Sequence, residues 1–109
     1  MSGCIVVFST VPDTDTGRKI ARGVLEKRLA ACVNITGPLE SHYWWEGELQ
    51  QEPEHLLILK TREELFPALE EAVRSLHPYD VPEIIALPVG QGSPAYLNWI
   101  GSETHGNTG

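Results

Sequence analysis

The stretch "LHPYDVPEI", residues 76–84, holds the side chains of this chain that could most readily do chemistry together. His77 offers an imidazole and Glu83 a carboxylate, on either side of a short turn that also carries Tyr79. With a thiolate such as Cys32 brought in by a sheet, these groups would suit copper or zinc. Spacing alone supplies no ligand set, because the chain has no CxxC, HxH or HExxH motif and its histidines are dispersed. A hydrogen-bonded structural histidine is the simpler interpretation.

The sequence supports a catalytic site no more strongly than it supports a metal site. Ser9 ends the first predicted strand without an adjacent base, and Cys32 lies on a predicted buried strand, where a thiol usually packs rather than reacts. Asp80 and Glu83 are close in sequence, but a turn followed by a strand does not by itself aim both carboxylates at one substrate. The chain has neither a GxGxxG motif nor a P-loop. We therefore expect no enzyme.

Basic residues at the end of a predicted hairpin offer a different kind of site. Lys60 and Arg62 could form an anion-binding pocket with basic residues of the first predicted helix, Lys19, Arg22 and Arg28. A solvated rim of the molecule is the more ordinary interpretation of scattered basic residues. The sequence alone does not decide between an anion-binding pocket and a solvated rim.

Composition limits the class of protein. The chain has 109 residues, 41% of them hydrophobic and 21% charged, which is typical of one globular domain. Its apolar runs are far shorter than the roughly 20 residues that cross a bilayer, so we expect no membrane span. A formal net charge of -7 argues against a nucleic-acid partner. The two cysteines predict reduced thiols, and a start without leader features predicts a cytoplasmic protein.

The beginning of the chain predicts a strand followed by a helix. Residues 3–11 are almost uniformly apolar and β-branched, which favours a central strand covered on both faces. Candidate N-caps at 13–15 then precede apolar residues with helical spacing through Leu29. This pattern predicts an amphipathic helix that packs on a sheet.

Two more strands are predicted to form a long hairpin. Residues 32–35 have strand character, and Pro38 should bulge or interrupt the strand because it lacks an N–H group. Aromatic and β-branched stretches on both sides of a glycine indicate hairpin arms within 39–61. Glu52 and Pro53 predict an irregularity in the second arm.

A second helix follows the hairpin. Thr61 and Glu64 match a capping box, and apolar residues then recur with helical spacing. Pro67 is comfortable only in a first turn, so the regular helix could begin a few residues after the box. It must end by His77, because the proline that follows disfavours helical backbone in the residue before it.

The order of elements predicts the fold. Residues 81–90 form the last predicted strand, and Ser93 is the predicted N-cap of a short C-terminal helix. The resulting order, βαββαβ, is the α+β, ferredoxin-like split βαβ pattern, with two helices on one face of an antiparallel sheet. We expect one domain over 1–102 and a mobile tail over 103–109.

Three adjacent aromatic residues in the hairpin predict an assembly. Tyr43, Trp44 and Trp45 cannot all face the core, because neighbouring residues of a strand point to opposite faces. Each could bury roughly 150 to 250 Å². We expect them to pack against another copy of the chain, although a single exposed tryptophan at a hairpin tip is an ordinary alternative.

Several motifs, taken together and in order, resemble one protein family. They are "RLAACVNI" (28–35), "YWWEGE" (43–48), "LLILKT" (56–61), "LHPYDVPEIIALPV" (76–89) and "YLNWI" (96–100). The chain resembles the CutA family of divalent-ion tolerance proteins over nearly its whole length. The "HPY-x-VPE" run with the upstream "LAACVN" is the most specific part of the match.

The resemblance implies a ferredoxin-like homotrimer, cytoplasmic in bacteria and without established catalysis, similar in architecture to the PII signalling proteins. It also implies tolerance of copper and other divalent cations, with copper bound by cysteine and histidine. His77, Glu83 and Cys32 match family positions and are the metal candidates. The chain departs from some members by carrying Ser9 in place of a cysteine and Leu76 in place of a histidine, which leaves the copper site incomplete.

We expect the functional cleft to lie between subunits. It would gather His77, Tyr79 and Glu83 near a neighbouring copy, with Lys60 and Ser9 also in the cleft. An alternative is a PII-like regulator, which would bind a small anionic ligand in the same cleft and signal to a partner protein.

Overall fold

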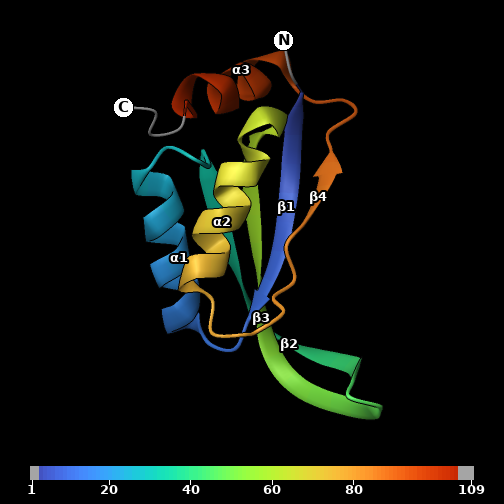
Figure 1. Cartoon of the computed structure of the whole chain (residues 1–109). Coiled ribbons are helices and arrows are strands. Elements are labelled where there is room, and N and C mark those ends of the chain that lie inside the picture. Colours follow the sequence, from blue (N-terminus) through green and yellow to red (C-terminus); the bar gives the residue numbers. More distant parts are fainter. Residues whose placement is uncertain (1–2, 106–109) are drawn as a thin grey trace.

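The sheet at the centre of the molecule follows the predicted topology. The computed structural model describes residues 3–105 and contains four strands, β1 (Cys4–Val11), β2 (Cys32–Trp45), β3 (Glu48–Arg62) and β4 (Ile85–Pro88). They form one antiparallel sheet in the order β2-β3-β1-β4. Helices α1 (Thr14–Glu26) and α2 (Phe66–Leu76) lie side by side on one face, while α3 (Pro94–Glu103) lies at one end (Figure 1). The α+β, ferredoxin-like prediction is confirmed.

The core lies between the sheet and helices α1 and α2. Alternate residues of β1 and β3 point into it, because successive side chains of a strand face opposite sides. The intervening residues of β1 are only half-buried, so the strand is not covered on both faces as its apolar sequence predicted. The buried hydrophobic cluster consists of Ile5, Val7, Val11, Ile20, Val24, Leu29, Ala30, Leu57, Leu59, Leu69, Ala72 and Val73.

Hydrogen bonds of individual side chains determine where helices α1 and α2 begin. The Asp13 side chain accepts a hydrogen bond from the Thr16 N–H at 2.7 Å and caps α1, as predicted. The capping box before α2 does not form, because the Thr61 hydroxyl is buried and donates to the Leu29 carbonyl at 2.6 Å. A short 3-10 turn (Glu63–Leu65) intervenes, and α2 begins at Phe66 with proline in its first turn.

The hairpin of β2 and β3 projects beyond the body of the sheet. Its tip is the pair Glu46 and Gly47, both with positive φ (50° and 81°), as a two-residue type I′ turn requires. The predicted bulge is present as a register shift between Ile35 and Pro38. The predicted irregularity at Pro53 is wrong: β3 is continuous, because pairing with β1 has ended at His55 and a proline is tolerated where one side of a strand is unpaired.

The C-terminal part differs from the prediction in two places. The last strand covers only Ile85–Pro88, since residues 81–84 form a loop that contains Pro82 and lies beside the hairpin. The boundary expected at residue 102 falls inside α3, which continues to Glu103, and Thr104 is buried. Residues 106–109 of the predicted tail lie outside the described residues. Within residues 3–105, no helix is both long and apolar enough to span a membrane.

Candidate functional site

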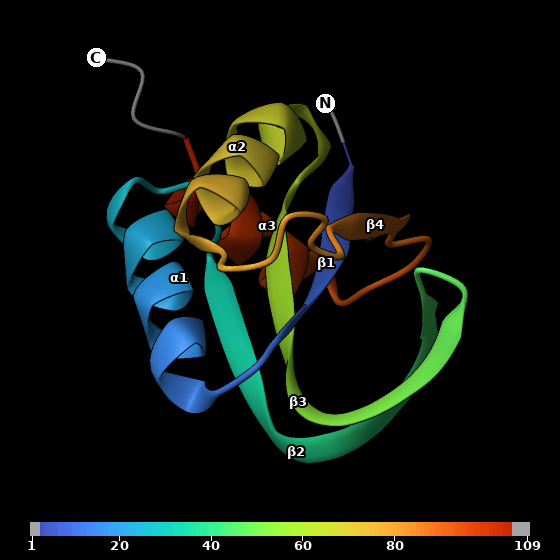
Figure 2. The same ribbon diagram turned by 60° about the horizontal axis from the view of Figure 1, so that its bottom comes forward.

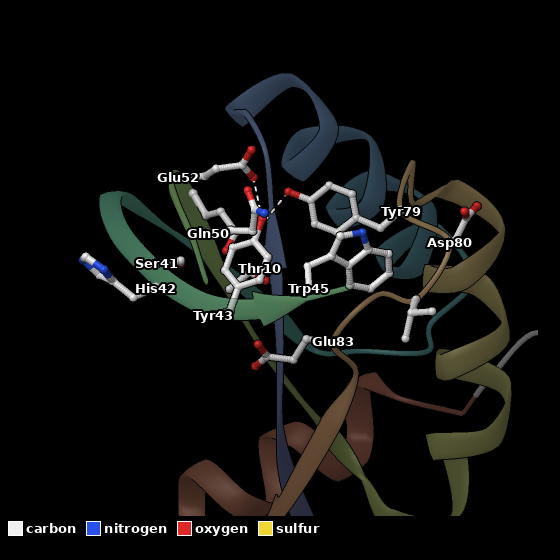
Figure 3. Close-up of a pocket in the computed structure, with 12 residues that line it drawn as sticks. Thr10, Ser41, His42, Tyr43, Trp45, Gln50, Glu52, Tyr79, Asp80 and Glu83 are labelled. Atoms are coloured by element: carbon white, nitrogen blue, oxygen red, sulfur yellow. Dashed lines mark hydrogen bonds between the residues drawn. The ribbon is translucent and has the colours of Figure 1, made fainter. Parts of the chain in front are cut away.

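A groove of about 630 Å³ lies between the curved hairpin and the loop before β4. The hairpin bends toward the side of the sheet where β4 lies (Figure 2). Residues of the hairpin form one wall of the groove. The loop after α2 forms the other wall. The lining residues are Thr10, Ser41, His42, Tyr43, Trp45, Gln50, Glu52, Glu54, Tyr79, Asp80, Val81 and Glu83 (Figure 3).

Two tyrosine–glutamate hydrogen bonds lie in the groove, one within the hairpin wall and one between the loop and the hairpin. The Tyr43 hydroxyl donates to Glu52 Oε1 at 2.6 Å, and the Tyr79 hydroxyl donates to Glu54 Oε2 at 2.8 Å. In Figure 3 the hydroxyl ends of Tyr43 and Tyr79 point toward one another from opposite sides. The hydrogen bond to Glu52 raises the pKa of Tyr43 to about 12. Burial, and then the hydrogen bond to Glu54, raise the pKa of Tyr79, so both phenols are neutral donors at pH 7.

The groove carries uncompensated negative charge. Among the residues that the structure describes, four carboxylates line it, from Glu52, Glu54, Asp80 and Glu83, and no lysine or arginine does. None of the four forms an ion pair with any of residues 3–105. Glu54 is only 6% exposed. Burial, followed by repulsion from the Glu54 carboxylate, raises the pKa of Glu83 above its ordinary value.

His77 lies behind the groove and has a structural role in this chain. It is buried, and its Nε2 lies 2.7 Å from the Thr10 carbonyl oxygen. Its Nδ1 accepts the backbone N–H of Tyr79 at 3.2 Å, so Nδ1 carries no hydrogen and Nε2 is the donor. The two rings are in contact, with centroids 4.7 Å apart. Both nitrogens are occupied, and a metal could reach His77 only by breaking a hydrogen bond.

Three other residues expected at the site lie elsewhere. Cys32 pairs with Lys60 across β2 and β3, at the other end of the sheet, and its thiol contacts the Asn34 side chain at 3.6 Å. The Lys60 ammonium lies over the Tyr96 ring of α3, 5.9 Å from its centroid. Ser9 is fully buried on the core side of β1, and its Oγ has no hydrogen-bond partner among the described residues. None of Cys32, Lys60 and Ser9 lines the groove.

The three hairpin aromatics divide between two faces. Tyr43 and Trp45 line the groove, as alternate residues of one strand should. Trp44 points the other way and pairs with Leu49 of β3, and these two side chains are 70% and 67% exposed. Tyr43 and Trp45 thus line the groove, while Trp44 presents an apolar surface near the hairpin tip.

The expected metal ligands do not converge within one chain. Among residues 3–105 there is no group of three or more histidine, cysteine, aspartate or glutamate side chains placed to hold one ion. Cys32 lies at the other end of the sheet from His77 and Glu83, so the three donors do not form a copper site in a single subunit. Glu52 and Glu54, which were not predicted as site residues, line the groove instead. They are two positions apart on one strand, so both side chains point to the same face.

Comparison with known proteins decides the family. A family model described as "CutA1 divalent ion tolerance protein" matches residues 5–103. The chain belongs to the CutA1 family. It is 51% identical to Protein CutA 1, chloroplastic, from Oryza sativa over 92% of this chain and 56% of that protein. It is 50% identical to the divalent-cation tolerance protein CutA of Thermus thermophilus over 91% of this chain and 96% of that protein.

Solved CutA1 structures share the whole fold. The crystal structure of CutA1 from Oryza sativa matches with a TM-score of 0.92 and 49% identity, covering 95% of both chains. That of the Thermus thermophilus protein matches with a TM-score of 0.91 and 48% identity, covering 94% of this chain and 99% of the other. The family predicted from the motifs is therefore confirmed.

The prediction of a cytoplasmic location is wrong, because relatives in the family are named for other compartments. The rice and Arabidopsis thaliana relatives are named chloroplastic, and the Archaeoglobus fulgidus CutA structure is described as periplasmic. The last has a TM-score of 0.89 and 38% identity, over 92% of this chain and 97% of that chain. The chain also spans about half the length of the rice and Arabidopsis relatives, 56% and 55%.

Proposed function

We propose that this CutA1-family chain is a homotrimeric divalent-cation tolerance protein that binds cations at the carboxylates of the groove, without catalysing a reaction. The proposal is carried by the four groove carboxylates, which form no ion pair with any of the described residues 3–105 and of which Glu54 is only 6% exposed. A buried charge is costly unless a counter-ion accompanies it. A bound cation would supply that counter-ion.

The donor set favours hard cations over copper. Carboxylate oxygens suit magnesium, calcium and manganese, whereas copper prefers imidazole and thiolate. Because no three ligands converge within residues 3–105, an ion here would keep several waters or take ligands from a neighbouring copy. Copper at Cys32, His77 and Glu83, as the sequence suggested, would need those residues to meet between subunits and His77 to release a hydrogen bond.

Oligomerisation is supported by the face of the sheet opposite α1 and α2. Apolar side chains of β1, β3 and β4 gather there by strand register, because paired residues share a face. Ile85 and Leu87 are each about half exposed, at 52% and 51%, and a monomer rarely leaves a large apolar patch in water. The face comprises Val6, Phe8, Leu56, Ile58, Ile85 and Leu87, and Trp44 with Leu49 adds a second apolar surface on the hairpin.

The PII-like alternative is less well supported. A small anionic ligand would need positive charge in the groove, but its lining contains four carboxylates and no lysine or arginine. Lys60 and Arg62 do not meet at the groove: Lys60 lies over Tyr96, and Arg62 bonds to Glu64 and Thr104. The charge of the groove favours a cation.

Calorimetric titration tests the proposal. Wild type, Glu83→Gln and the control Glu26→Gln would be titrated with Mn²⁺, Mg²⁺ and Cu²⁺ in turn. Glu26 is exposed on α1, outside the groove. We expect saturable Mn²⁺ and Mg²⁺ binding that Glu83→Gln weakens roughly fivefold, since one charge near the ion is worth about 1 kcal/mol in water. Absence of saturable Mn²⁺ and Mg²⁺ binding to wild type would refute the proposal.

A further inference from the structure

The groove is larger than a bare ion needs. Its volume of about 630 Å³ falls within the roughly 300 to 1,000 Å³ typical of small-molecule sites. The described residues provide no cluster of three metal ligands to fix an ion at one point in this space. Negative charge is instead spread along the groove, over Glu52 and Glu54 of β3 and over Asp80 and Glu83 of the facing loop.

Aromatic rings form a substantial part of the walls. Tyr43 and Trp45 of β2 and Tyr79 of the loop all line the groove, and Figure 3 shows the Trp45 and Tyr79 rings on its loop side. Ring faces attract cations and also contact methylene groups. A metal ion surrounded by water makes little use of such walls, whereas an alkylammonium group uses both the charge and the apolar surface.

The carboxylates retain acceptors for such a ligand. Tyr43 bonds Oε1 of Glu52, and Tyr79 bonds Oε2 of Glu54. The second oxygen of each glutamate accepts no hydrogen bond from any of residues 3–105. An ammonium group has three N–H donors and could bond to one of these oxygens. Glu52 and Glu54 are two residues apart on one strand, which places their backbones about 6.6 Å apart.

We infer that the groove binds a linear organic diamine, with its two ammonium groups on separate carboxylates and its methylene chain against Trp45 and Tyr79. The inference rests on the proposed function, since it takes the groove to be a cation site, and it names the class of cation. Two positive charges separated by a short alkyl chain match the spread of carboxylates. The aromatic walls distinguish this ligand from an inorganic ion of the same charge.

Ligand size and charge are tested first, by calorimetry on the wild-type protein at constant ionic strength. The probes are 1,4-diaminobutane, butylamine with one charge, 1,4-butanediol with none, and Mn²⁺. We expect saturable binding of the diamine, binding of butylamine at least about fivefold weaker through loss of one ion contact, and no binding of the diol. Equal affinity for diamine and butylamine, or no diamine binding because a second copy fills the groove, would overturn the inference.

The aromatic wall is tested with matched tryptophan variants. Trp45→Leu removes the ring in the groove, and Trp99→Leu removes an equally exposed ring on α3 (46% and 40% exposed). We expect Trp45→Leu to weaken diamine binding about fivefold, through loss of the ring surface that contacts the methylene chain, and to leave Mn²⁺ affinity unchanged. Trp99→Leu should change neither affinity. Equal diamine affinity in wild type and Trp45→Leu would contradict the inference. Because both variants replace partly exposed side chains, their folding is checked by circular dichroism.

The two ligands also separate the inference from the proposed function. Mn²⁺ binding without diamine binding would overturn the inference and leave metal binding standing. Diamine binding without Mn²⁺ or Mg²⁺ binding would support the inference and refute metal binding at the groove. Where the wild-type protein binds the diamine, Glu52→Gln, at an exposed position, should weaken that binding, and an unchanged diamine affinity in this variant would contradict the placement of an ammonium group on β3.

Discussion

The Nε2–H group of His77 donates a hydrogen bond of 2.7 Å to the carbonyl oxygen of Thr10, 67 positions away in the sequence. This bond ties the end of α2 to β1. Together with the bond from the Tyr79 N–H to Nδ1, it fixes the loop that carries Tyr79 toward Glu54. His77 thus supports one wall of the groove without lining it.

Replacing His77 should affect stability more than cation binding. His77→Ala leaves the Thr10 carbonyl without its donor and should lower the free energy of unfolding by about 2 kcal/mol. His77→Gln can place an amide N–H near the same carbonyl and should recover part of the loss. Urea denaturation measures both, and Mn²⁺ titration of the folded variants should give wild-type affinity. Loss of metal affinity at unchanged stability would instead make His77 a ligand.

Two buried hydroxyls provide a matched pair for stability. The Ser9 Oγ is buried without a partner among residues 3–105, whereas the Thr61 hydroxyl donates to the Leu29 carbonyl at 2.6 Å. Ser9→Ala should therefore raise the free energy of unfolding by up to about 1 kcal/mol, and Thr61→Val should lower it by about 1 kcal/mol. Urea denaturation of both variants checks the signs. Destabilisation by Ser9→Ala equal to that of Thr61→Val would show that Ser9 has a partner in solution.

If the chains assemble through the face of the sheet opposite α1 and α2, a charge placed on that face should disrupt the assembly. Leu87→Glu puts a charge on that face, and burying this charge in an interface without a partner costs several kcal/mol. The proposed trimer should therefore dissociate to monomers at micromolar concentration. Leu25→Glu, at a leucine 37% exposed on α1, serves as the control and should leave the trimer intact. Sedimentation equilibrium measures the mass. A wild-type monomer, or a Leu87→Glu trimer, would remove this face as the interface.

The sequence predicted the fold because its strongest local signals agree with the tertiary structure. Strand and helix periodicity, the Asp13 cap and the proline bulge in β2 each correspond to an observed feature. Prediction failed where a distant contact overrode a local preference. Thr61 has the spacing of a capping box, but its hydroxyl bonds to Leu29, 32 residues earlier. Residues 81–84 are apolar enough for a strand, yet they form a loop in which Val81 and Glu83 line the groove.

The site was predicted only in part for a related reason. Tyr79 and Glu83, both named from the sequence, line the groove because they lie in the loop between α2 and β4. Which strand faces this loop depends on the curvature of the hairpin and on tertiary packing, and neither can be derived from spacing. Glu54, which is buried, was therefore not a candidate from the sequence. Lys60 was assigned to the cleft, but its ammonium group lies over Tyr96 of α3 and it does not line the groove.

The pKa of the Glu83 carboxyl group gives the most direct test of the cation-binding groove. Carbon-detected NMR titration of the wild-type protein should give a pKa above the ordinary 4.5, because burial and the Glu54 carboxylate both disfavour the ionised form. Glu54→Gln removes one of these causes and should lower the pKa. Saturating Mg²⁺ should also lower it, because a bound cation favours the carboxylate. A Glu83 pKa that falls in Glu54→Gln but does not respond to Mg²⁺ would contradict cation binding at the groove.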